Sequence, residues 1–117
     1  MAGISIILRR PPYGTTDASE AVRHSLGGIT ENMSVKLILL DGGVTIAKKG
    51  QNTDSTAYLN MESGLIDCIE MGAEVYADNM SIVEACLEAK DLIDGVRVSN
   101  SSEIADIIRN SDTTMIF

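Results

Sequence analysis

Short apolar runs and amphipathic stretches alternate along the 117 residues of the chain. The apolar runs are rich in β-branched residues and have the length of strands. Five strands are predicted in this way, at residues 3–8, 35–40, 73–77, 96–99 and 113–117. The second run is apolar at every position except Lys36, which is typical of a strand with both faces covered.

Between these runs, apolar residues recur at the three- and four-residue spacing of amphipathic helices. Four helices and their inward-facing residues are predicted: one from Thr16 or Asp17 (Val22, Leu26, Ile29, Met33), one from Asp54 to Gly72 (Tyr58, Met61, Leu65, Cys68, Ile69), one capped by Ser81 (Ile82, Ala85, Cys86, Ala89), and one from Ser101 or Ser102 (Ile104, Ile107, Ile108). The stretch 44–51 is compatible with a short helix or a turn.

Strands that alternate with helices are joined by right-handed crossovers and pair in parallel. The order of elements therefore predicts an α/β fold, a three-layer α/β/α sandwich with a mainly parallel five-stranded sheet. At this length we expect one domain spanning residues 1–117.

The charge of the chain is acidic and unevenly distributed. There are 17 acidic and 9 basic residues, a net charge of -8, and a mean hydropathy of +0.11. Residues 1–53 hold six basic and four acidic side chains, whereas residues 54–117 hold three basic and thirteen acidic ones. With three Tyr, one Phe and no Trp, few rings can stack on bases, and the acidic balance repels phosphate backbones. Direct nucleic-acid binding is therefore not expected.

No targeting or membrane-spanning segment is predicted. The apolar runs are far shorter than the roughly 20 residues of a membrane span, and residues 1–8 lack the cationic start and the length of a signal peptide. We expect a cytoplasmic protein without membrane contact.

The sequence lacks the common cofactor, metal and hydrolase signatures. Neither GxGxxG nor GxxxxGK followed by Ser or Thr is present. Cys68 and Cys86 have no histidine or third cysteine near them, so no metal site and no disulfide framework are predicted. Cys68 lies on an apolar helix stripe and is predicted to be a small buried residue. His24 has no evident Ser or Cys partner and is expected to be structural or on the surface.

Candidate chemistry gathers in the loops that follow the strands, because carboxyl ends of parallel strands meet at one edge of a sheet. Arginines in the first loop, with Lys48 and Lys49, can make this rim locally positive. The candidate rim residues are Arg9, Arg10, Tyr13, Asp41, Gly42, Asp78, Asn79 and Ser81. Asn79 can shape its turn and Ser81 can cap the following helix. A small-anion-binding module based on Arg9 and Arg10 is one function compatible with this rim.

Five fragments in order carry a family resemblance. They are Arg10-x-Pro12-Tyr13-Gly14, Asp41-Gly42-x-Val44, Lys49-Gly50-Gln51, Val75-Tyr76-x-Asp78-x-x-Ser81 and Asp112-x-x-Met115-Ile116-Phe117. Over nearly the whole chain, this set resembles the DsrE/DsrF sulfur-relay family, in particular its DsrF/TusC branch.

The resemblance implies a YchN-like fold and assembly into trimers or hexamers, either of this chain alone or with DsrE/DsrH-like subunits. Such assemblies pass persulfide sulfur to sulfur-carrier proteins, toward 2-thiouridine in transfer RNA or within dissimilatory sulfur oxidation. The family's carrier cysteine corresponds to Asp78 here. Because a carboxylate cannot hold a persulfide, the resemblance implies a non-carrier subunit for structure and partner docking, rather than a complete enzyme.

One departure keeps a second hypothesis open. Where the family commonly has Arg-Gly in the helix after the carrier loop, this chain has Ala85-Cys86. Cys86 is predicted to lie a turn or more inside that helix. It is either a packing or interface residue, or the reactive thiol of a persulfide-carrying sulfurtransferase.

Overall fold

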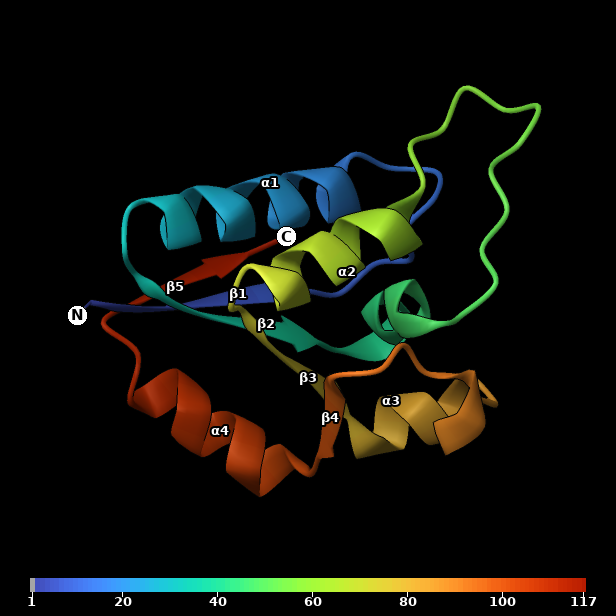
Figure 1. Cartoon of the computed structure of the whole chain (residues 1–117). Helices are drawn as coiled ribbons and strands as arrows, with labels where there is room; N and C mark the ends of the chain where they lie inside the picture. The colour runs from blue at the N-terminus through green and yellow to red at the C-terminus, as the bar shows by residue number, and fades with distance from the viewer. Residues whose placement is uncertain (1) are drawn as a thin grey trace.

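The computed structural model describes residues 2–117. Its centre is one five-stranded sheet in which all neighbouring strands run parallel (Figure 1). The strand order is β4-β3-β2-β1-β5. The strands are β1 (Gly3–Leu8), β2 (Ser34–Leu39), β3 (Glu74–Asp78), β4 (Val96–Ser99) and β5 (Thr113–Ile116). The predicted strands are confirmed with shifts of at most one residue at their ends, and the sheet is entirely parallel.

Helices cover both faces of the sheet, as the alternation of elements predicts. Buried residues of α1 (Asp17–Thr30), α2 (Met61–Glu70) and α3 (Asn79–Glu84) belong to one core cluster, and those of α4 (Ser101–Arg109) belong to another; Figure 1 shows α1 and α2 across the sheet from α4. Two short 3-10 helices, η1 (Asp41–Ala47) and η2 (Ala89–Asp91), lie in the connections. The stretch 44–51, for which the sequence allows a short helix or a turn, is therefore helical only as far as Ala47.

The two faces of the sheet differ in how much apolar surface they bury. On the α1/α2 side, residues such as Ile6, Leu37 and Val75 are fully buried in the main core. On the other side, Ile7 and Ile38 form a smaller cluster with Ile104 of α4. No helix within residues 2–117 is long and apolar enough to cross a membrane.

The predicted start of the second helix at Asp54 is wrong. The helix begins at Met61, with Asn60 as its N-cap, and Tyr58 lies in an exposed loop. In this loop the hydroxyl of Thr56 donates to the carbonyl of Thr53 and accepts from the Tyr58 N–H. Short polar side chains that bond the nearby backbone compete with helix formation, which explains the later start. The predicted end at Gly72 is confirmed within two residues, and Gly72 has φ +114.

The predicted position of Cys86 inside a helix is also wrong, since α3 ends at Glu84. Cys86 has φ +58, its N–H donates to the Val83 carbonyl, and the Leu87 N–H donates to the Ile82 carbonyl. This pair of bonds is the Schellman ending, in which the left-handed residue is usually glycine. Ala89 then lies in the separate 3-10 helix η2 rather than on α3.

We expect Cys86→Gly to stabilise the protein, because a non-glycine residue in the left-handed region costs about 1–2 kcal/mol. Glycine loses more chain entropy on folding, so the net gain is about 0.5–1 kcal/mol in the free energy of unfolding, measured by urea denaturation. Cys86→Ala removes the thiol but keeps the strain and is the control. Equal stabilisation by both variants would contradict this explanation.

Candidate functional site

The loops after β1 and β2 lie against one another at the carboxyl ends of the strands. The backbone of Gly43 passes so close to the carbonyl oxygen of Leu8 that a Cβ there would collide with it. A Cβ at Gly42 would lie 2.8 Å from the Cδ of Pro11. The Asp41-Gly42-Gly43 turn therefore serves close packing of two loops.

Asp78 and Ser81 form a hydrogen-bonded connection between β3 and the loop after β2. The Asp78 carboxylate oxygen Oδ2 accepts from the Ser81 N–H at 3.1 Å and from the Ser81 hydroxyl at 2.7 Å. The Ser81 hydroxyl accepts from the Asp41 N–H at 2.8 Å. Asp41 has φ +50, a left-handed conformation that this bond helps to hold. The structure thus brings together the predicted rim residues Asp41, Asp78 and Ser81.

The roles of the residues around α3 differ from those predicted. Asp78, rather than Ser81, is the N-cap, and Ser81 lies inside the first turn with 4% of its surface exposed. The prediction that Ser81 caps the helix is therefore wrong. Asn79 is the exposed first residue of α3.

The two arginines of the first loop point to solvent instead of converging on a pocket. The Arg10 guanidinium lies 3.4 Å from the carboxylate of Asp17 at the start of α1, and 61% of its side chain is exposed. The Arg9 side chain is exposed, and the backbone N–H of Arg9 donates to the carbonyl of Phe117. Lys49 lies elsewhere, with its Nζ 3.6 Å from the Asp94 carboxylate. The structure therefore does not assemble these cations into one anion site.

Tyr13 joins the first loop to the start of α2. Its hydroxyl donates to the side-chain oxygen of Gln51 at 2.6 Å and accepts from the Met61 N–H at 3.2 Å. Its ring centroid lies 5.6 Å from that of Tyr58. Gln51 in turn donates through Nε2 to the carbonyls of Ile46 and Lys48. The sequence does not predict this role of Gln51, because hydrogen bonds between side chains far apart in the chain produce no periodic pattern of residues.

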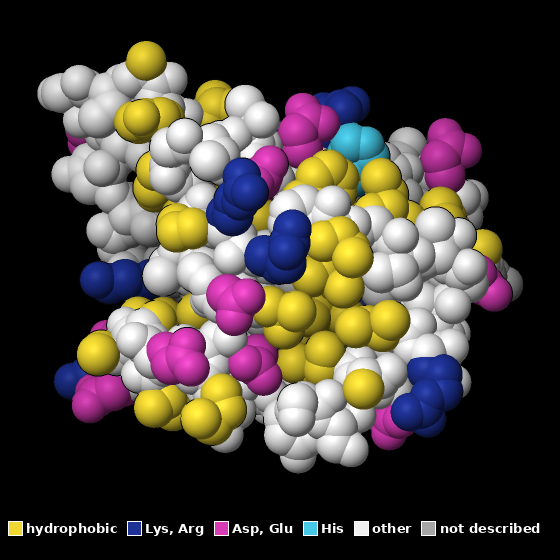
Figure 2. Space-filling model, turned by 180° about the vertical axis from the view of Figure 1, so that it is seen from behind, with side chains coloured by type: hydrophobic (Ala, Val, Ile, Leu, Met, Phe, Trp, Pro, Cys, Tyr) yellow, Lys and Arg dark blue, Asp and Glu magenta, His cyan; other side chains and the backbone are white. Residues whose placement is uncertain are grey.

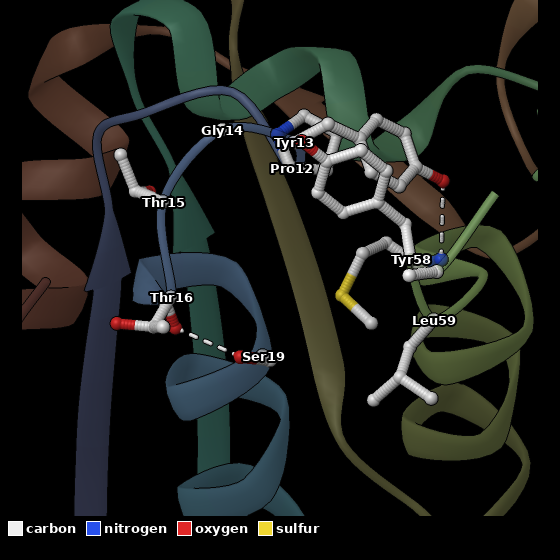
Figure 3. Close-up of a pocket in the computed structure, with 10 residues that line it drawn as sticks. Pro12, Tyr13, Gly14, Thr15, Thr16, Ser19, Tyr58 and Leu59 are labelled. Carbon is white, nitrogen blue, oxygen red and sulfur yellow. Dashed lines mark hydrogen bonds between the residues drawn. The ribbon is translucent and has the colours of Figure 1, made fainter.

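A pocket of about 340 Å³ opens beside Tyr13, between the start of α1 and the loop before α2 (Figure 3). Figure 3 shows Tyr13, Tyr58 and Leu59 along one side and the hydroxyls of Thr15, Thr16 and Ser19 along the other. No charged side chain lines it. Arg9 and Arg10 are absent from the lining, so this pocket does not provide the positive rim that the sequence suggested.

The two cysteines have opposite environments. Cys68 is fully buried on α2, where desolvation of the thiolate and then the nearby Asp67 charge raise its pKa to about 11. Its prediction as a buried residue is confirmed. Cys86 is exposed, just beyond α3, at the end of the helix opposite Asp78.

The fold and the rim define a class: an α/β sandwich whose β3 ends in a carboxylate that caps the next helix. A family model described as DsrE/DsrF-like matches residues 2–117. The chain belongs to the DsrE/DsrF-like family, and the broad resemblance seen in its sequence is confirmed.

Two similar proteins match nearly the whole chain. An uncharacterized protein of Methanopyrus kandleri is 34% identical over 115 residues, which cover 97% of this chain and 93% of the relative. An uncharacterized protein of Methanocaldococcus jannaschii is 31% identical over 114 residues, covering 97% of each chain.

Two solved structures share the fold. The ychN protein from E. coli superposes with a TM-score of 0.91 at 22% identity, over 100% of both chains. A protein of unknown function from Methanobacterium thermoautotrophicum gives a TM-score of 0.71 at 13% identity, over 93% of this chain and 90% of the other. The YchN-like fold is thereby confirmed.

We expect Ser81→Ala to lower the free energy of unfolding by about 1–3 kcal/mol, because it leaves the Asp41 N–H without this acceptor and the Asp78 carboxylate without one donor. Urea denaturation measures the loss. Ser102→Ala, at an exposed position in the first turn of α4, is the control and should stay within about 0.5 kcal/mol. A loss no larger than the control's would show that the connection contributes little.

A thiol reagent should distinguish the cysteines. In the native protein at mildly alkaline pH, we expect one thiol per chain to react quickly, and Cys86→Ser to abolish this reaction. Cys68 should react only after denaturation, because its raised pKa keeps it protonated and its side chain is buried. Fast labelling of Cys68 in native protein would contradict the buried environment.

Proposed function

We propose that this protein is a non-carrier subunit of a persulfide-transfer assembly, of the DsrF/TusC type. Its family membership and the carboxylate at the carrier position support this role. In such transfer, an acceptor thiolate attacks the outer sulfur of a donor persulfide, the sulfur–sulfur bond breaks, and the donor leaves as a thiolate. Asp78 has no sulfur with which to carry out this step.

The hydrogen bonds of Asp78 are the observation that carries the proposal. One of its carboxylate oxygens accepts two hydrogen bonds from Ser81, and the Ser81 hydroxyl accepts from the loop after β2. The side chain at the carrier position thus contributes to the shape of the rim. This is compatible with a subunit that builds a surface next to a partner's thiol.

Exposed apolar side chains beside this position support a docking role. Met80 and Val83 lie one turn apart on α3 and are 63% and 62% exposed. Residues at this spacing share one face of a helix. We propose that this face contacts another subunit, either a copy of this chain or a DsrE/DsrH-like carrier.

The edge of the sheet offers a second apolar surface. Figure 2 shows hydrophobic side chains gathered on the back of the molecule, below the histidine. There His24 lies 5.2 Å, ring to ring, from Phe117, and Ile116 of the edge strand β5 is exposed. An edge strand has backbone groups free to pair with another chain. A trimer or hexamer is the assembly we propose.

An exposed Cys86 favours a second candidate, a self-sufficient persulfide carrier. The deciding experiment incubates the pure protein with a cysteine desulfurase and cysteine and then measures the intact mass. We expect the wild-type mass to stay unchanged, whereas Asp78→Cys, which places a thiol at the carrier position, should gain the mass of one sulfur atom.

The control for this experiment is Cys86→Ser, alone and combined with Asp78→Cys. An adduct on the wild-type protein that disappears in Cys86→Ser would overturn the non-carrier role and establish the carrier. An adduct on Asp78→Cys that persists when Cys86 is removed would assign the sulfur to position 78.

A further inference from the structure

A groove of about 380 Å³ lies between α2 and the connection that leads from η2 into β4. Three isoleucines, Ile66, Ile69 and Ile93, provide its apolar part. Its charged residues are Lys49, Glu62, Glu70 and Asp94. None of these seven residues belongs to the strand-end rim.

The apolar part of the groove is held by packing and by the backbone. Ile93 is 4% exposed, and its N–H donates to the carbonyl of Ala47 at 2.8 Å. The backbone of Gly95 approaches Ile69 so closely that a Cβ would lie 3.0 Å from its Cγ2. β-Branched side chains also have restricted rotamers. The isoleucines therefore form a preformed apolar surface.

The charges around this surface are predominantly negative. Three carboxylates, those of Glu62, Glu70 and Asp94, line the groove with one ammonium, that of Lys49, whose Nζ lies 3.6 Å from the Asp94 carboxylate. Glu62 also accepts from the Gln51 N–H at 2.8 Å, which fixes one carboxylate in place. The groove thus combines an aliphatic surface with an excess of negative charge.

This combination is complementary to a lysine side chain. Its four-carbon stem can lie along the isoleucines while its ammonium stays at the carboxylates and in contact with water. The carboxylates would repel an anionic ligand, and a neutral aliphatic ligand would gain no electrostatic attraction from them.

The groove is open to solvent, which favours a side chain presented by a partner protein over a free small molecule. Glu70 and Asp94 are exposed, so a small free amine would remain largely in water, whereas ligand sites usually bury most of their ligand. A lysine presented by a partner gains affinity from the residues on either side of it. We infer that this groove docks a lysine side chain of a partner protein.

The test uses NMR of the full-length protein labelled at isoleucine methyl groups. Three capped peptides are titrated: Leu-Lys-Leu, the same with norleucine at the centre, and the same with glutamate. We expect saturable shifts at Ile66, Ile69 and Ile93, with the lysine peptide binding at least about threefold tighter than the norleucine peptide. This preference should weaken as salt is added.

Matched variants locate the charge effect. Glu70→Gln combined with Asp94→Asn should reduce affinity for the lysine peptide to that of the norleucine peptide. Glu31→Gln, an exposed carboxylate just after α1, should leave affinity unchanged. The inference does not depend on the proposed sulfur-relay role, because the peptides carry no sulfur and none of the measured residues lies at the rim.

Four outcomes would overturn the inference. These are equal affinity for the lysine and norleucine peptides, shifts confined to other parts of the protein, binding of n-butylammonium as tight as that of the lysine peptide, and a changed native mass in the double variant. The third would make the groove a site for free amines. The fourth would assign it to contacts between copies of this chain.

Discussion

The parallel pairing of β1 with β2 is the constraint on which the rest of the structure depends. Six residue pairs, from Gly3 with Ser34 to Leu8 with Leu39, are in register, and most of their side chains are buried. A slip of one residue would turn the buried side chains to the opposite face. The register therefore fixes where both strands end. The turn after β2 packs directly on the end of β1, where the Gly43 backbone lies against the Leu8 carbonyl oxygen.

The rim built on these strand ends is dominated by hydrogen bonds that hold it together. Hydrogen bonds among Asp78, Ser81 and the Asp41 N–H connect β3 and α3 to the loop after β2, and the Tyr13–Gln51 bond connects two further loops. A carboxylate that caps a helix is suited to the proposed role of a subunit that shapes a surface rather than carrying sulfur. The same surface has exposed apolar side chains on α3, Met80 and Val83, which the proposed role assigns to contact with another subunit.

The uneven charge of the chain can be assigned to particular surfaces of the fold. Three of the thirteen acidic residues of the second half surround the isoleucine groove beside α2. Arg9 and Arg10 of the first half lie in the loop after β1, where Arg10 pairs with Asp17. The two surfaces therefore present different chemistry.

The sequence by itself determined the five strands, the parallel sandwich and the buried state of Cys68, because these follow from the local period of apolar residues. It also placed Asp78, Ser81 and Asp41 at one edge. Tertiary structure decided the rest: the late start of α2, the left-handed ending at Cys86, the role of Asp78 as the cap and the hydrogen bond between Tyr13 and Gln51. These features depend on individual hydrogen bonds, most of them local and one, between Tyr13 and Gln51, between residues far apart in the chain. Such bonds have no periodicity, so only the folded molecule reveals which of several polar neighbours makes each one.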